Sequence, residues 1–155
     1  MNFPHGYFAQ CIFDKKTKTY EISFPDFPTV FTVADDLEQA QEMALEALTS
    51  ALETDFDRGE DLPKSHSPST KAKKDKTSFF VKIPPSIYIA YVLRYWREKS
   101  QLTQKQVASR LGVTYQAYQR MEKPGKANLT VETLSNIFSA MGLEFDLKIG
   151  KKTAA

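Results

Sequence analysis

Two side chains that can recognise bases in double-stranded DNA lie close together in the segment LTQKQVASRLGVTYQAYQRME, which begins at Leu102. A glutamine, as at Gln116, can form paired hydrogen bonds with adenine N6 and N7, and an arginine, as at Arg120, with guanine O6 and N7. The alternative is that both are ordinary exposed polar residues. Base recognition requires that the fold present them together on one element.

A helix, a tight turn and a second helix are predicted around these side chains. Thr103 can cap the first helix, which runs to Leu111. Ala108 is small, as a residue must be where the second helix crosses at close range. Gly112 is expected to end the first helix in the left-handed backbone region, and Thr114 is expected to cap the second helix.

This run resembles the Cro/repressor type of helix-turn-helix, in which the second helix enters the major groove. The resemblance places Tyr115, Gln116, Gln119 and Arg120 on the groove-facing side and Gln104 where the family contacts phosphate. A tyrosine is unusual at its position, so stacking or a sugar contact is expected of it rather than base readout. Lys105, Lys126 and Asn128 are predicted phosphate contacts. The predicted DNA-binding set is Gln104, Lys105, Thr114, Tyr115, Gln116, Gln119, Arg120, Lys126 and Asn128.

Residues 1–62 are predicted to form a β-meander and one long helix. Two β-prone runs, Tyr7–Asp14 and Thr19–Phe24, flank a polar turn, which is the pattern of a hairpin. The sequence PDFP then stops the second strand, and a third is predicted over Thr29–Val33. Asp35 followed by Glu38 predicts a capping box for a helix over about 36–57, in which leucine and alanine recur at helical spacing.

Residues 63–76 are polar, basic and punctuated by proline, which indicates a linker or long loop. The following run SFFVKI, 78–83, is predicted to return to the first sheet as a fourth strand, with a domain boundary near residue 84. The pattern then becomes helical. The alternating run EFDLKI, 144–149, predicts a short closing strand, which could instead contribute to a dimer.

The charges divide the chain into two oppositely charged parts. Residues 1–62 hold thirteen acidic and four basic residues, a charge of −9, whereas residues 63–155 hold six acidic and seventeen basic residues, a charge of +11. Because long-range fields select partners by sign, the acidic part favours a basic protein and the basic part favours nucleic acid. The alternative is that each charged part is simply a solvated surface that selects no partner.

The order of elements before residue 84 resembles the N-terminal domain of HicB antitoxins. The matching stretches are YEISFPDFP, DLEQAQEMALEALTSALE, GEDLP with the SPS of 67–69, and VKIP before a Cro-type domain. The resemblance implies a partial ribonuclease-H-like fold that is not a nuclease and that covers the active surface of a small basic HicA messenger-RNA interferase. Candidate toxin contacts are Asp26, Asp35, Asp36, Glu38, Glu42 and Glu46.

The expected fold class is therefore α+β, with a toxin-neutralising domain over 1–83 that contains the basic loop, and an all-α helix-turn-helix domain with its short strand over 84–155. A single cysteine, Cys11, excludes a disulfide framework. No signal-peptide pattern and no apolar run of about 20 residues is present, so a cytoplasmic chain without membrane, metal or cofactor is expected.

The leading hypothesis is an antitoxin that also represses its own operon, acting as a homodimer or higher homo-oligomer. One competing hypothesis is a transcription regulator whose N-terminal domain senses a small molecule. Another is a metal-dependent nuclease, for which Asp14, Asp26 and Asp35 at strand ends would have to converge on metal ions.

Overall fold

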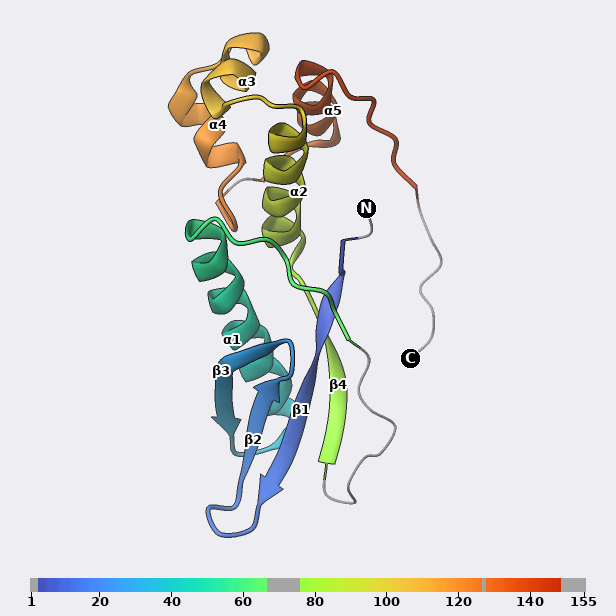
Figure 1. The fold of residues 1–155 in the computed structure, drawn as a ribbon. Helices are drawn as coiled ribbons and strands as arrows, with labels where there is room; N and C mark the ends of the chain where they lie inside the picture. The colour runs from blue at the N-terminus through green and yellow to red at the C-terminus, as the bar shows by residue number, and fades with distance from the viewer. Residues whose placement is uncertain (1–2, 67–75, 127, 149–155) are drawn as a thin grey trace.

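The computed structural model describes residues 3–66, 76–126 and 128–148, and Figure 1 shows their arrangement. The elements are β1 (Gly6–Asp14), β2 (Thr19–Phe24), β3 (Phe27–Ala34), α1 (Leu37–Asp57), β4 (Lys76–Lys82), α2 (Pro85–Lys99), α3 (Gln104–Leu111), α4 (Tyr115–Met121) and α5 (Val131–Ala140). A sheet with one long helix thus precedes a group of helices, which confirms the α+β class. None of these helices has the length and apolar character needed to cross a membrane.

The four strands form one antiparallel sheet in the order β3-β2-β1-β4. The predicted hairpin is confirmed, and Lys18 takes a positive φ of 57° in its turn. The turn at Pro25 and Asp26 separates β2 from β3, so Pro28 lies within an edge strand, where its missing N–H removes no ladder bond that the sheet needs. The predicted return of a fourth strand beside the first is also confirmed.

One face of this sheet is covered by α1 (Figure 1). Inward residues of β1, including Tyr7 and Cys11, pack with the α1 residues Ala40, Ala44, Leu48 and Leu52. These four α1 side chains are 0% exposed, and their spacing matches the predicted helical periodicity. The small alanines let the helix lie close to the strands.

The cap of α1 differs by one residue from the prediction. Asp36, not Asp35, occupies the cap position, and its Oδ1 accepts a hydrogen bond of 2.8 Å from the Gln39 backbone N–H. The Asp35 backbone N–H donates in turn to Gln39 Oε1 at 2.7 Å. Since α1 begins at Leu37, Gln39 rather than Glu38 stands three residues after the cap, where glutamine serves as well as glutamate.

A second hydrophobic cluster joins α2 to α3, α4 and α5, and α2 contributes to both clusters. Ile87 and Tyr91 belong to the cluster under the sheet, whereas Leu93 and the half-buried Trp96 belong to the second. The position predicted as a domain boundary, residue 84, is therefore followed by a helix that packs on both sides.

The predicted C-terminal strand is wrong for the described residues 144–148, which have no strand structure. Phe145 instead stacks on Phe138 of α5, with ring centroids 5.4 Å apart. A strand requires a neighbouring strand to pair with, and this segment lies against a helix. Ile149, the SPS of 67–69 and most of the basic loop predicted over 63–76 lie outside the described residues.

Candidate nucleic-acid interface

The turn between α3 and α4 is built by local hydrogen bonds, as predicted. Thr103 caps α3 through a reciprocal pair of bonds with Gln106, at 3.2 Å to the Gln106 N–H and at 2.8 Å from the Thr103 N–H. Gly112 ends α3 with φ of 69°, a conformation that favours glycine. The Thr114 hydroxyl accepts a bond of 3.2 Å from the Ala117 N–H and so starts α4.

Helix α4 presents polar side chains on one side and core side chains on the other. Gln116, Gln119 and Arg120 are exposed, as the predicted DNA-reading face requires. Tyr118 is 0% exposed and anchors the opposite side in the second cluster. Burial and the negative charge of the adjacent Glu122 raise the pKa of Tyr118. The predicted base readers are therefore held on a helix that cannot rotate without exposing its core face.

Tyr115 is half-buried and lies between two other predicted DNA contacts. The Lys105 Nζ lies 5.8 Å from the centroid of its ring, and Gln119 Nε2 donates to its hydroxyl at 3.4 Å. Gln104, Lys105 and Tyr115 also line one hollow, together with Asp57 at the end of α1. A tyrosine ring placed beside a lysine suits a contact with the sugar-phosphate backbone.

A buried ion pair that the sequence did not reveal holds the start of α3. The Glu122 carboxylate is 1% exposed and accepts bonds from Arg97 Nε at 2.8 Å and Arg97 Nη2 at 2.7 Å. Gln104 Nε2 donates to the same carboxylate at 3.0 Å, and Arg97 Nη1 donates to the Leu102 carbonyl at 3.1 Å. The hydrogen bond to Glu122 raises the pKa of Arg97. Because the Gln104 amide carries two N–H groups, a second acceptor can bind beside Glu122, as the predicted phosphate contact requires.

A second buried arginine joins α2 to the end of α1. Arg94 donates to the backbone carbonyls of Phe56, at 2.8 Å, and of Glu60, and its guanidinium lies 4.2 Å from the centroid of the Phe56 ring. Tyr91, one turn earlier, donates to the Leu52 carbonyl at 2.6 Å. The sequence prediction missed this buried arginine. It could have been found because Arg94 falls at helical spacing from Ile87 and Tyr91, where an apolar core residue would be expected.

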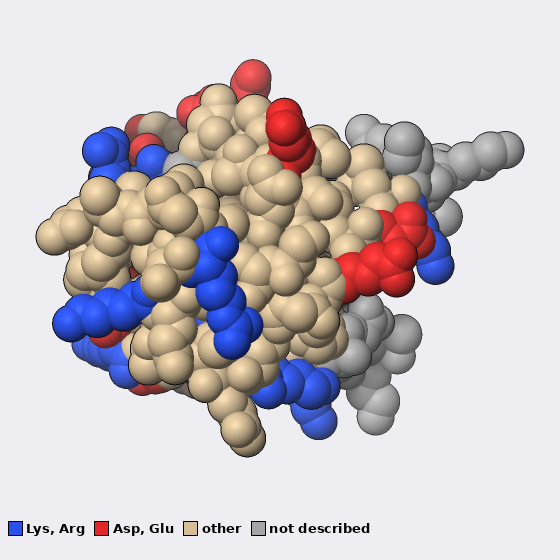
Figure 2. Space-filling view, turned by 90° about the horizontal axis from the view of Figure 1, so that it is seen from above, with Lys and Arg blue, Asp and Glu red and all other residues tan. Residues whose placement is uncertain are grey.

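The remaining predicted phosphate contacts are exposed but lie apart from that hollow. Asn128 lines a different hollow with Pro85 and Leu129, at the start of α2. Lys126 lies in the loop after α4, where its N–H donates to the Lys123 carbonyl. Seen from the helix-turn-helix end, most Lys and Arg side chains lie on the side of α3 and α4, and the most prominent acidic side chains lie at the upper and right margins (Figure 2).

The predicted toxin contacts fall into two groups. Five of them are exposed: Asp35, Asp36, Glu38, Glu42 and Glu46. Asp26 differs, because its side chain is only 4% exposed and accepts a bond of 2.6 Å from His66 Nδ1. Little of its carboxylate is thus presented to a partner.

Comparison with known proteins covers both parts of the chain. Residues 6–88 match the family described as "HicB_like antitoxin of bacterial toxin-antitoxin system", and residues 93–148 match the family described as "Helix-turn-helix". "Antitoxin HicB 1" of Photorhabdus laumondii is 32% identical, over 84% of this chain and 78% of that protein. "Antitoxin HicB 2" of the same organism is 27% identical, over 87% of this chain and 91% of that protein.

A crystal structure of the N-terminal domain of Burkholderia pseudomallei antitoxin HicB has a TM-score of 0.42 at 20% identity and covers 50% of this chain and 96% of that one. Two findings assign the family: the match over residues 6–88, and the 32% identity with the first relative over most of both chains. The chain belongs to the HicB-like antitoxins of bacterial toxin-antitoxin systems and carries a helix-turn-helix domain.

Proposed function

We propose that this chain binds and inhibits a small HicA-type messenger-RNA interferase through its sheet and α1, and represses its own operon through α3 and α4. The observation that carries the proposal is the joining, in one chain, of a HicB-like domain to a capped helix-turn-helix with exposed Gln116, Gln119 and Arg120. The toxin's messenger-RNA substrate and the operon DNA both lie in the cytoplasm, so the protein would act there.

Electrostatics supports a basic protein as the partner of the N-terminal part. An enzyme that cleaves RNA must attract phosphates, so its active surface is expected to be basic. Residues 1–62 carry a charge of −9, and Glu38, Glu42 and Glu46 form an exposed row at intervals of four residues along α1. Such a surface attracts the toxin and repels its RNA substrate, so inhibition would need no chemistry from this chain.

DNA binding is proposed to require two copies. A single helix-turn-helix contacts few bases, and domains of this type read two half-sites one helical turn or a multiple apart. In each half-site Gln116 and Arg120 would contact base edges, while Gln104 and Lys105 would contact phosphates.

The geometry of the strand ends does not favour a nuclease. Asp14 and Asp35 lie at the end of the sheet where Asp14 pairs with Thr19 and Tyr20 with Ala34. Asp26 lies in the turn between β2 and β3, at the other end. Two-metal chemistry needs convergent carboxylates, and Asp26 lies at the opposite end of the sheet from Asp14 and Asp35. The family assignment also favours an antitoxin over a small-molecule sensor.

The test is an RNA-cleavage assay with the toxin encoded beside this protein's gene. Adding the full chain is expected to abolish cleavage at a stoichiometric ratio, while the chain alone with magnesium leaves RNA intact. A fragment of the operon's promoter should bind the same preparation. Cleavage by the chain alone, or full toxin activity in its presence, would refute the proposal.

A further inference from the structure

Strand β3 leaves one edge of the sheet open. Within the described residues it pairs with β2 on one side only. Its sequence, FPTVFTVA, contains no charged residue, and Phe31 and Val33 are 78% and 54% exposed. Edge strands usually carry charges, bulges or a covering element that prevent pairing with another chain. This edge has a proline, and its register with β2 is irregular between Phe27 and Phe31, so the part suited to regular pairing is Phe31–Ala34.

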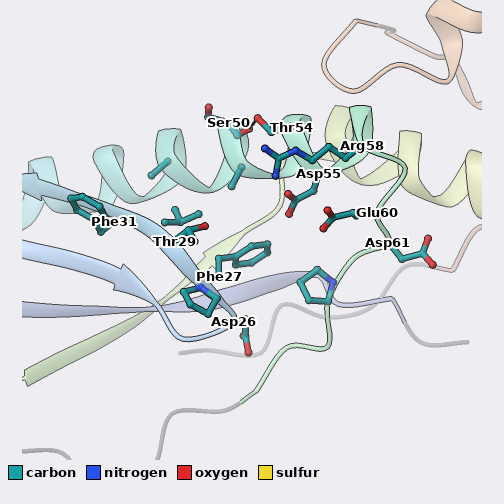
Figure 3. A pocket seen from close by; sticks show the side chains of 15 residues that line it. Asp26, Phe27, Thr29, Phe31, Ser50, Thr54, Asp55, Arg58, Glu60 and Asp61 are labelled. Atoms are coloured by element: carbon teal, nitrogen blue, oxygen red, sulfur yellow. Dashed lines mark hydrogen bonds between the residues drawn. The ribbon is translucent and has the colours of Figure 1, made fainter.

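A groove of about 610 Å³ lies between β3 and α1 at this edge, and Figure 3 shows its lining side chains. The side of α1 that lines the groove carries only small side chains along two turns: Ala47, Ser50, Ala51 and Thr54. The neighbouring core face of the same helix carries Leu48 and Leu52. Small residues on the groove side leave space where the inward side chains of a fifth strand would lie.

One end of the groove is acidic. Asp55, Glu60 and Asp61 lie there, and Arg58 is the basic residue among those that line the groove (Figure 3). Asp61 also lies 3.8 Å from Arg94 Nη2, so Asp55 and Glu60 are the carboxylates that a further cation would serve best. Burial, with a contribution from the nearby Glu60, raises the pKa of Asp55. A cationic side chain placed at this end would relieve that repulsion.

We propose that the groove binds an extended segment of the toxin, which pairs with the free edge of β3, packs short side chains against α1 and places a lysine or arginine at the acidic end. This inference rests on the proposed function and locates the interface. Backbone pairing would supply affinity, and the groove and its acidic end would supply specificity. A second copy of this chain fits less well, because its uncharged β3 brings no cation to the carboxylates.

The test compares two tryptophan substitutions at exposed positions of α1. Ser50→Trp fills the groove, whereas Gln41→Trp, the matched control, adds the same side chain outside the set of groove-lining residues. The probe is the purified toxin from the adjacent gene, with the full-length chain as its partner. Ser50→Trp should weaken binding by about 30-fold, as expected for disruption of an interface hot spot, and Gln41→Trp by less than about 3-fold.

Hydrogen exchange gives a second, independent measurement. Amides of β3 should become protected when toxin is added, and those of β4, the opposite edge of the sheet, should not. If the wild-type chain binds toxin but Ser50→Trp binds as tightly and β3 amides stay unprotected, the groove is not the interface, although the proposed function stands. Protection of β3 that grows with protein concentration without toxin would assign the edge to a second copy and overturn the inference. If the wild-type chain does not bind the toxin at all, both proposals fail.

Discussion

Replacing Glu122 by leucine should destabilise the helix-turn-helix by removing the partner of a buried cation. The Arg97 side chain is 11% exposed, and its two short bonds to Glu122 would be lost. Breaking a buried pair from one side costs about 3–5 kcal/mol, because a charge is left without compensation. Arg97 keeps its bond to the Leu102 carbonyl and its contact of 3.4 Å with the exposed Glu98 carboxylate, so a loss near the lower limit, about 3 kcal/mol, is expected.

Urea unfolding of the full chain, followed by tryptophan fluorescence, measures this loss where it occurs. Trp96 is the single tryptophan and packs against the second cluster. The double variant R97M/E122L should recover stability to within about 1 kcal/mol of the wild type, since it removes both charges of the pair. If E122L costs less than about 1 kcal/mol, or if the double variant is no more stable than E122L, the ion pair does not stabilise the start of α3.

Gln116→Ala and Arg120→Ala should each weaken operator binding by about 1–3 kcal/mol in fluorescence anisotropy, and an unchanged base preference would show that other residues read the sequence. Tyr118→Phe should leave the free energy of unfolding unchanged or raise it by up to about 1 kcal/mol, since the Tyr118 hydroxyl is buried near Glu122 without a bond of hydrogen-bonding geometry; a clear loss would show that this hydroxyl donates to Glu122. Burial raises the pKa of Tyr7, Tyr91 and Tyr118 in the folded chain, so unfolded chains lose these protons first above about pH 10. Stability should therefore be unaffected by these groups below that pH and fall by up to about 4 kcal/mol per pH unit above it, whereas constant stability to pH 11 would contradict the burial argument.

Features that depend on neighbouring residues were predictable from the sequence. The positive φ of Gly112 and the caps at Thr103 and Thr114 follow from local rules, and the structure confirms them. The cap of α1 was misplaced because Asp35 with Glu38 and Asp36 with Gln39 present the same pattern one residue apart. Local rules identify a motif but do not choose between overlapping copies of it.

Features that depend on distant contacts were not predictable in the same way. Arg97 and Glu122 are 25 positions apart, and nothing near either one indicates a buried pair. His66 and Asp26 are 40 positions apart and pair the segment after α1 with the turn between β2 and β3, which leaves the Asp26 side chain only 4% exposed. The alternation of 144–148 predicted a strand, but alternation alone supplies no partner strand.

The central claim is that this chain neutralises a toxin and that its DNA binding is a separate, regulatory activity. The most direct test measures the growth of cells that express the adjacent toxin. In these cells the full chain, or its Gln116→Ala/Arg120→Ala double variant, is co-expressed from an unrelated promoter. Both forms are expected to restore growth equally. Growth arrest in the presence of the wild-type chain would contradict the claim, and arrest with the double variant alone would show that neutralisation depends on DNA binding.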